Sequence, residues 1–317
     1  MTESSARRPA PGTVRVTLLV DNERGAPGLR AQWGLSAWIE TDRARVLLDS
    51  GGNDAFRRNA QTLGIQLERA DAFVLSHGHG DHGGGIGTVV RAAPAASLVM
   101  HPAGLAPRFW LGRTGKVDPI GLQDRSLAAL VSVADRVTWA LGPVEVAPGI
   151  WATGPIPRRH PLEEAERNFF LDHSCTVRDH VVDDQALWVE TPGGLVVLLG
   201  CAHAGVVNTL DHVRRLAAEM HAPGPEPRLP ADVRPGAGGD LPLAADGLPR
   251  VRAVIGGMHL LHASPARLHA TSEALLAAGV RLVAPVHCTG KRGKRHLRER
   301  LGDACVAAAT GSVLEIA

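Results

Sequence analysis

The order of hydrophobic and polar positions divides the chain into short apolar runs, most of which end at a turn signal. Runs rich in β-branched residues predict strands, and longer stretches with a period near 3.6 predict helices. The predicted strands cover residues 14–20, 33–40, 44–48, 72–75, 97–100, 144–153, 185–190, 195–199, 252–255 and 282–286. The predicted helices cover residues 53–63, 85–93, 122–133, 206–220, 265–278 and 296–301. Strands first outnumber helices and then alternate with them, which favours an α/β fold of two packed sheets with helices outside.

Three segments depart from this pattern and set the expected domain organisation. Residues 1–13 are polar and contain proline, so we expect a disordered start, followed by a single domain over residues 14–317. The pattern weakens over residues 102–180, which are expected to form a lid-like segment. Within it, residues 155–180 are rich in Arg, His and Asp and resemble a long functional loop. Residues 222–250 are rich in Pro and Gly and predict a surface insertion.

Composition narrows the classes of function. The 317 residues can bury a full core, and a formal net charge of +2 gives little support to nucleic-acid binding, because the basic residues cluster only at residues 291–295. No apolar run approaches the roughly 18 residues that span a bilayer, so no membrane partner is expected. The start lacks a secretory apolar core and the four cysteines are widely spaced, which indicates the cytoplasm. The oligomeric state is left open, with a homo-oligomer allowed.

The strongest chemical signal follows the predicted strand at residues 72–75. His77, His79, Asp81 and His82 lie within six positions, separated by Gly78 and Gly80. Neutral imidazole and carboxylate are ligands that divalent metals such as zinc prefer, and the glycines let neighbouring side chains converge on a small volume. A histidine-rich surface loop is the alternative, but such loops rarely follow a buried strand so directly.

Three further predicted strands also end in a histidine. Residues 195–199 lead to His203, residues 252–255 to His259, and residues 282–286 to His287. In layered α/β folds, strand ends on one side gather at a single ligand-binding edge. We therefore expect these histidines to belong to the same site as the first motif.

The pattern His77-x-His79-x-Asp81-His82 resembles the signature of the metallo-β-lactamase superfamily. This resemblance implies an αββα sandwich of two sheets flanked by helices. It also implies that His77 and His79 bind one metal ion, and that Asp81 and His82 bind a second. Asp49 would support the site from behind the ligands, and His287 falls where the superfamily has its last metal histidine.

A narrower resemblance, to the branch that includes the dihydropterin–ribofuranosylaminobenzene phosphate synthase family, rests on several short motifs. These are residues 19–22, 34–36, 184–187, 200–205, 256–260 and 287–290. One departure stands out, since the superfamily usually places a bridging aspartate where this chain has Cys201. His203 is our preferred ligand there, while Cys201 and Asp184 are either ligands or supports behind them.

Two metal ions, expected to be Zn²⁺ with Mn²⁺ or Fe²⁺ as alternatives, would suit a hydrolase that uses a metal-activated water on a small ester, amide or phosphoester. Asp81 and His259 are the candidate catalytic proton carriers, and Lys291, Arg292 and His180 are candidate contacts for a phosphorylated substrate. Two alternatives remain open at this point. One is a transferase whose metals activate a diphosphate leaving group, and the other is a non-catalytic metal sensor.

Overall fold

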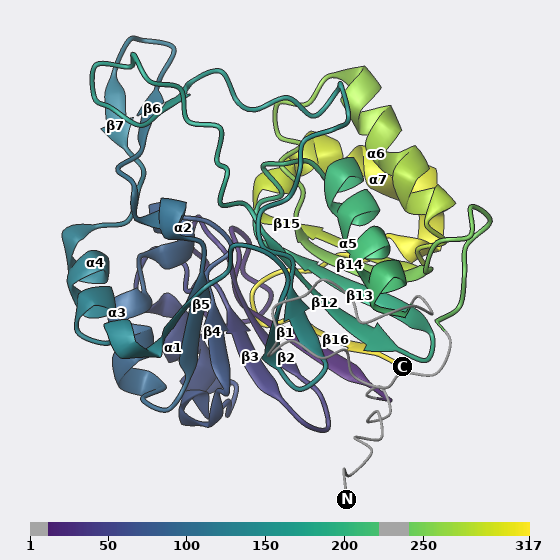
Figure 1. The fold of residues 1–317 in the computed structure, drawn as a ribbon, viewed down its shortest axis with the longest axis horizontal. Coiled ribbons are helices and arrows are strands. Elements are labelled where there is room, and N and C mark those ends of the chain that lie inside the picture. Colours follow the sequence, from purple (N-terminus) through teal and green to yellow (C-terminus); the bar gives the residue numbers. More distant parts are fainter. Residues whose placement is uncertain (1–11, 222–240) are drawn as a thin grey trace, which may run out of the picture.

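The computed structural model describes residues 12–221 and 241–317, which form two mixed β-sheets packed face to face between two layers of helices (Figure 1). The first sheet has the strand order β16-β1-β2-β3-β4-β5-β8, and the second has the order β15-β14-β13-β12-β10-β9. This is the expected αββα sandwich. The predicted disorder of residues 1–13 and the predicted insertion at 222–250 lie largely outside the described residues.

The first sheet is antiparallel on one side and parallel on the other. Its strands are β1 (Val14–Val20), β2 (Ser36–Glu40), β3 (Arg45–Leu48), β4 (Ala72–Val74), β5 (Ser97–Met100), β8 (Val137–Trp139) and β16 (Val313–Ile316). Pairing is antiparallel from β16 to β3 and parallel from β3 to β8. The helices α1 (Ala55–Thr62), α2 (Gly80–Gly83), α3 (Ile86–Ala92) and α4 (Asp124–Val131) lie on this side of the molecule.

The second sheet has the same division. Its strands are β9 (Val144–Ala147), β10 (Ile150–Ala152), β12 (Ala186–Thr191), β13 (Gly194–Leu199), β14 (Val251–Gly257) and β15 (Leu282–Val286). Pairing is antiparallel from β9 to β13 and parallel from β13 to β15. The helices α5 (Val206–His221), α6 (Pro265–Ala277) and α7 (Gly290–Leu301) cover its outer face.

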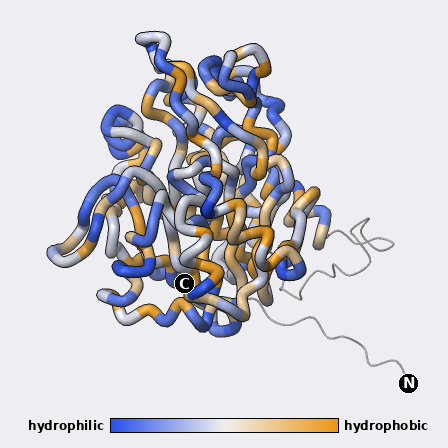
Figure 2. Tube along the Cα trace, turned by 90° about the vertical axis from the view of Figure 1, so that its left-hand side faces the viewer, coloured by the Kyte–Doolittle hydropathy of each residue, from blue (hydrophilic) through white to orange (hydrophobic). Residues whose placement is uncertain are grey.

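Three hydrophobic clusters hold these layers together. One lies between the sheets, where Leu48 and Val74 belong to the same cluster as Leu198 and Ala284. The other two join each sheet to its own helices, with Phe56 packed in the first and Leu268 in the second. Figure 2 shows hydrophobic chain running through the interior, with hydrophilic stretches at the periphery. Because both faces of each sheet are covered, the central strands are apolar throughout rather than alternating.

The structure departs from the sequence prediction in short elements. A small third sheet of β6 (Phe109–Leu111), β7 (Val117–Pro119) and β11 (Phe169–Phe170) stands at one end of the sandwich. Its strands have two or three residues each and are mostly half-exposed, and most residues of β8 and β16 are half-exposed or exposed. None of these strands therefore forms an apolar run in the sequence. We call residues 107–123 and 166–170 the lid. The lid is narrower than the expected segment 102–180, since α4, β8, β9 and β10 belong to the main layers.

Helix α7 begins six residues earlier than predicted. Its first turns carry a basic run that hides the helical period, and Gly293 allows them to approach Leu260 closely. The short 3-10 turns are η1 (Leu67–Arg69), η2 (Pro102–Leu105), η3 (Ala134–Arg136), η4 (His287–Thr289) and η5 (Gly302–Ala304). Within the described residues no helix is long and apolar enough to cross a bilayer.

Candidate metal centre

The carboxyl ends of the parallel strands of both sheets meet at one edge, and the histidines of the sequence motif gather there. His77, His79 and His203 form one group whose potential ligand atoms all lie within 4.8 Å of one another. Asp81, His82 and His287 form a second group by the same measure. Strand β4 delivers the first motif, β13 delivers His203, and β15 delivers His287. The first sheet and the second sheet thus both contribute to each group.

Separations within the groups match those of nitrogens around one ion. The His77 Nε2 atom lies 3.0 Å from His79 Nδ1 and 3.1 Å from His203 Nε2. In the second group, Nε2 of His287 lies 3.2 Å from His82 Nε2 and 3.4 Å from an Asp81 oxygen. Two nitrogens bound tetrahedrally to zinc at about 2.0–2.1 Å stand roughly 3.3 Å apart. The donor set therefore fits two divalent cations.

Hydrogen bonds from behind fix the tautomers of three histidines. The Nδ1 of His82 lies 2.6 Å from Asp49 Oδ2, and the Nδ1 of His287 lies 2.9 Å from the amide oxygen of Asn22. Ser76 Oγ lies 2.7 Å from Asp49 Oδ2 and 2.9 Å from His77 Nδ1, so it donates to the former and accepts from the latter. Because each Nδ1 is held in this way, each of these imidazoles turns its Nε2 atom into the cluster, the orientation a ligand needs.

Charge in the cluster also suits cations. Burial and the neighbouring imidazoles hold the pKa values of His77, His79 and His203 well below the usual range, so these rings are neutral. Burial opposes ionisation of Asp81, but His82 and His287 together outweigh burial and hold its pKa well below the usual range. For His82 burial also opposes the charged form, yet Asp49 and Asp81 raise its pKa to about 9. The carboxylates of Asp49 and Asp81, next to the three neutral imidazoles, make the cluster a favourable place for positive charge.

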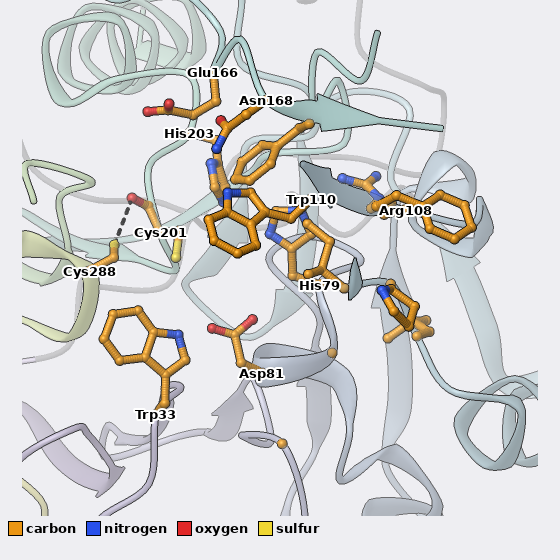
Figure 3. A pocket seen from close by; sticks show the side chains of 18 of the residues that line it. Trp33, His79, Asp81, Arg108, Trp110, Glu166, Asn168, Cys201, His203 and Cys288 are labelled. Carbon is orange, nitrogen blue, oxygen red and sulfur yellow. Dashed lines mark hydrogen bonds between the residues drawn. The ribbon is translucent and has the colours of Figure 1, made fainter. Parts of the chain in front are cut away.

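Cys201 lies between the two groups. Its Sγ is 3.1 Å from His82 Nε2, and it belongs to possible ligand sets with His77, with His203 and with His287. The Cys288 thiol donates to the backbone oxygen of Cys201 (Figure 3). A sulfur thus stands where the superfamily resemblance leads one to expect a carboxylate.

His259 lies beside the first group and is held by a residue of the lid. Its Nε2 is 3.0 Å from Glu166 Oε1, and its ring centroid is 4.3 Å from that of His203. Burial opposes protonation, but hydrogen bonds to Cys288 and Glu166 raise the pKa of His259 to about 9. Both His259 and Glu166 line the cavity, so the proton they share is open to a bound molecule.

A cavity of about 1100 Å³ opens above the two groups. Its walls are largely apolar and aromatic, and Trp33 and Trp110 both point into it, from the loop after β1 and from the lid (Figure 3). Phe169 of the lid packs edge-on to His79, with ring centroids 5.2 Å apart. The size lies at the upper end for pockets that take small molecules.

The structure brings together most, but not all, of the residues named from the sequence. Asp184 does not face the cluster; it accepts a hydrogen bond from the backbone of Ala204, next to His203. Lys291 and Arg292 are exposed on α7, and His180 is exposed on the loop before β12. None of these last three is among the residues that line the cavity. The prediction for these three residues rested on their charge and on the composition of their segments, and neither indicates which way a side chain points.

Other residues of the site were not anticipated from the sequence. Asn22, Ser76, Glu166 and Asp183 contact ligand residues or their backbone. Asn22 and Ser76 are polar residues that follow an apolar strand, and this position alone could have predicted that they lie at the edge where the histidines gather. Glu166 and Asp183 come from irregular segments, where the chain order carries no such signal.

Similar proteins place this geometry in context. The chain is 25% identical over 285 residues to the 7,8-dihydropterin-6-methyl-4-(beta-D-ribofuranosyl)-aminobenzene-5'-phosphate synthase of Methanocaldococcus jannaschii, covering 85% of each chain. It is also 25% identical over 276 residues to an uncharacterized protein of the same archaeon, covering 87% of this chain and 90% of that one.

Solved structures and a family model agree on the fold. A crystal structure described as a metal-dependent hydrolase of the beta-lactamase superfamily superposes with a TM-score of 0.71 at 24% identity, covering 96% of this chain and 99% of that one. The metallo-beta-lactamase fold protein YhfI from Bacillus subtilis gives a TM-score of 0.52 at 12% identity, with 95% and 99% covered. Residues 34–163 match the family model for the Metallo-beta-lactamase superfamily, a range that includes the first histidine motif.

Proposed function

The chain belongs to the metallo-β-lactamase superfamily, and from that premise we propose that it is a hydrolase dependent on two divalent metal ions and acting on a small ester, amide or phosphoester. The observation that carries the proposal is the pair of ligand groups at the floor of one large cavity. His77, His79 and His203 would hold one ion, and Asp81, His82 and His287 the other. Cys201 would bind one or both.

Zn²⁺ is the proposed metal, because imidazole nitrogen and thiolate sulfur are ligands that it favours. Mn²⁺ or Fe²⁺ would be favoured less by a sulfur ligand. All four cysteines lie within the described residues and are free thiols, which supports a reducing compartment such as the cytoplasm.

The protein side of the mechanism follows from the positions of its residues. When bound, the two ions would supply Lewis acidity that activates a water and polarises the scissile bond. The Asp81 carboxylate, ionised and facing the cluster, would help to hold one ion and would orient a water in the cavity by accepting a hydrogen bond from it. His259, protonated and hydrogen-bonded through Nε2 to Glu166, would give that proton to the leaving group once the bound substrate takes the place of the Glu166 oxygen beside Nε2. The lid would exclude bulk water through Phe169 and Trp110.

A variant of a ligand histidine tests this function directly. In His203→Ala we expect loss of one metal ion and a fall in kcat/KM larger than the roughly 10–100-fold that follows loss of an outer support. His269→Ala is the matched control, because His269 is an exposed residue of α6. Metal content after dialysis and turnover on ester, lactone, phosphomonoester and phosphodiester panels are the measurements. Wild-type protein that holds two ions and turns over no substrate of any panel would favour the metal sensor instead.

A second candidate is a transferase that releases diphosphate. It is supported by the name of the Methanocaldococcus relative, a synthase that aligns over 85% of both chains. A cavity of about 1100 Å³ is also large enough for two reactants. The discriminating assay supplies a dihydropterin that carries a diphosphate together with an aminobenzene acceptor. Diphosphate release that requires the acceptor would favour the transferase, and release without it would favour hydrolysis.

A further inference from the structure

Three consecutive polar residues before strand β12 contact the loops that carry the first ligand group. Asp183, Asp184 and Gln185 are all buried, with 1%, 2% and 2% of their surfaces exposed. None of them is among the potential ligands of the two groups. Such a run of buried polar side chains is expected only where each finds a partner.

Asp183 holds the turn between two ligand histidines. Its Oδ2 accepts a hydrogen bond of 2.7 Å from the backbone N–H of Gly78, which lies between His77 and His79. Its Oδ1 accepts from Arg108 at 2.5 Å, so the carboxylate itself is fixed by a buried guanidinium. A carboxylate held in this way defines where the Gly78 amide can lie.

The next two residues hold the other loops of the same group. The Oδ2 of Asp184 accepts a hydrogen bond of 2.7 Å from the backbone N–H of Ala204, directly after His203. Gln185 donates from its backbone N–H to Ser76 O and from Nε2 to Leu75 O, at the end of the strand that leads to His77. One short segment therefore contacts the chain on both sides of the gap that separates His77 and His79 from His203.

We propose that Asp183 and Asp184 are positioning residues that set the separation of the two loops and thereby the metal affinity of the His77, His79 and His203 group. Asp183 holds the backbone between His77 and His79, and Asp184 holds the backbone next to His203. The three imidazoles are thereby brought together although neither carboxylate is itself a ligand. The proposal rests on the metal site of the proposed function. It assigns a role to a segment that neither the ligand motif nor the relatives' descriptions mention.

The structure offers a matched control in Asp179. This residue also pairs with Arg108, at 3.2 Å, and is also buried, but its other oxygen accepts from Val181 and contacts no ligand loop. Asp183→Ala and Asp179→Ala each remove one of the two carboxylates around the same arginine. Both variants lose a buried ion pair with Arg108, but only Asp183→Ala also loses the hydrogen bond from the Gly78 amide. A difference in metal affinity between the two variants therefore measures the effect of that hydrogen bond.

The experiment measures metal binding in the full chain without substrate. Zinc affinity is obtained by competition with a chromophoric chelator, and the visible spectrum of the Co²⁺ form reports ligand geometry. We expect Asp183→Ala to weaken zinc binding by about 10–100-fold and to alter the Co²⁺ spectrum, since losing an outer support has effects of that size. Asp179→Ala should leave both unchanged. Equal losses in the two variants, or wild-type affinity in Asp183→Ala, would overturn the proposal.

Asp184 supplies a second test should Asp183→Ala fail to fold. Asp184→Ala is expected to lower zinc affinity in the same range, while Asp184→Asn keeps an oxygen that can accept from Ala204 and should restore it. Equal affinities in these two variants would count against the positioning role. Wild-type protein that takes up neither Zn²⁺ nor Co²⁺ would overturn the proposed function together with this inference, whereas metal uptake that is indifferent to residues 183 and 184 would overturn this inference alone.

Discussion

Four residues beside the candidate metal centre adopt left-handed backbone conformations although none is glycine. Asp49, Ala202, His259 and His287 have φ values of 56°, 54°, 46° and 48°. This conformation costs an L-residue roughly 1–2 kcal/mol, so it persists only where neighbouring contacts enforce it. His287 shows such a contact, since its N–H donates to Asp21 Oδ1 at 2.6 Å. Each of the four follows the end of a strand and turns the chain sharply at the edge of the cluster.

Cys201 is the residue whose replacement is most informative about the number of ions. In Cys201→Ser we expect the affinity for one of two zinc ions to fall at least about 10-fold, because a hydroxyl is a poorer ligand than a thiolate. Cys201→Asp should restore binding of both ions, since a carboxylate oxygen is an ordinary zinc ligand. Zinc content after dialysis against a weak chelator is the measurement.

Cys305→Ser is the control for that experiment, because Cys305 is buried in the cluster between the second sheet and its helices. Retention of both ions at full affinity in Cys201→Ser would show that the thiol is no ligand and only packs between the histidines.

At the scale of elements, strands with strong apolar runs were predicted closely, while the short strands of the lid were not. The bounds of β1, β5 and β15 coincide with the predicted runs, because their burial on both faces requires continuous apolar sequence. The lid strands β6, β7 and β11 are held by only a few pairs and by contacts with distant loops, such as the bond from Gly80 N to Ile120 O. The sequence of the lid itself does not indicate which distant residues its backbone will pair with.

Helix α5 depends on a carboxylate that lies outside it in sequence. The two oxygens of Glu163 accept hydrogen bonds from Val207 and Asn208, in the first turn of α5. Burial raises the pKa of Glu163 above its usual 4.5, although these backbone bonds oppose the rise. The folded state therefore binds this proton more tightly than the unfolded chain does.

The sign of the pH dependence follows from that difference. A raised carboxyl pKa in the folded state means that stability is lost as pH rises from about 4.5 through the folded pKa. In Glu163→Gln we expect the decline of unfolding free energy with pH to be flatter over that window. Urea unfolding of metal-free wild type and variant at several pH values measures it, and parallel curves would contradict the assignment.

At the scale of the whole molecule, the sequence predicted the layered fold and the edge at which the histidines gather, but not the polar contacts behind them. Four apolar strands that each lead into a histidine were sufficient to place His77, His203, His259 and His287 at one edge. The contact between Asp183 and Gly78 joins positions 105 residues apart, and only the packed sheets decide it. Long-range polar pairs of this kind leave no periodic pattern in the chain.

Metal removal should lower the stability of the entire fold. A zinc ion present at 100 times its dissociation constant stabilises the folded state by about 2.7 kcal/mol, which for a chain of 317 residues corresponds to a shift in Tm of roughly 4 °C. We expect excess chelator to lower the Tm of wild-type protein by this amount and added zinc to restore it. His203→Ala should respond less. A Tm that chelator leaves unmoved would argue against resident metal.

Each of the two candidate ligand groups draws residues from both sheets, and this has a consequence for the order in which the chain folds. His82 and His287 are 205 positions apart. An ion bound by both would act as a cross-link that closes a very long loop, and in chain-entropy terms a link across even 100 residues is worth about 4.7 kcal/mol. The first sheet alone offers only the motif from His77 to His82. Capture of metal by the complete set of ligands can therefore occur only after the second sheet has docked, and it locks that docking in place.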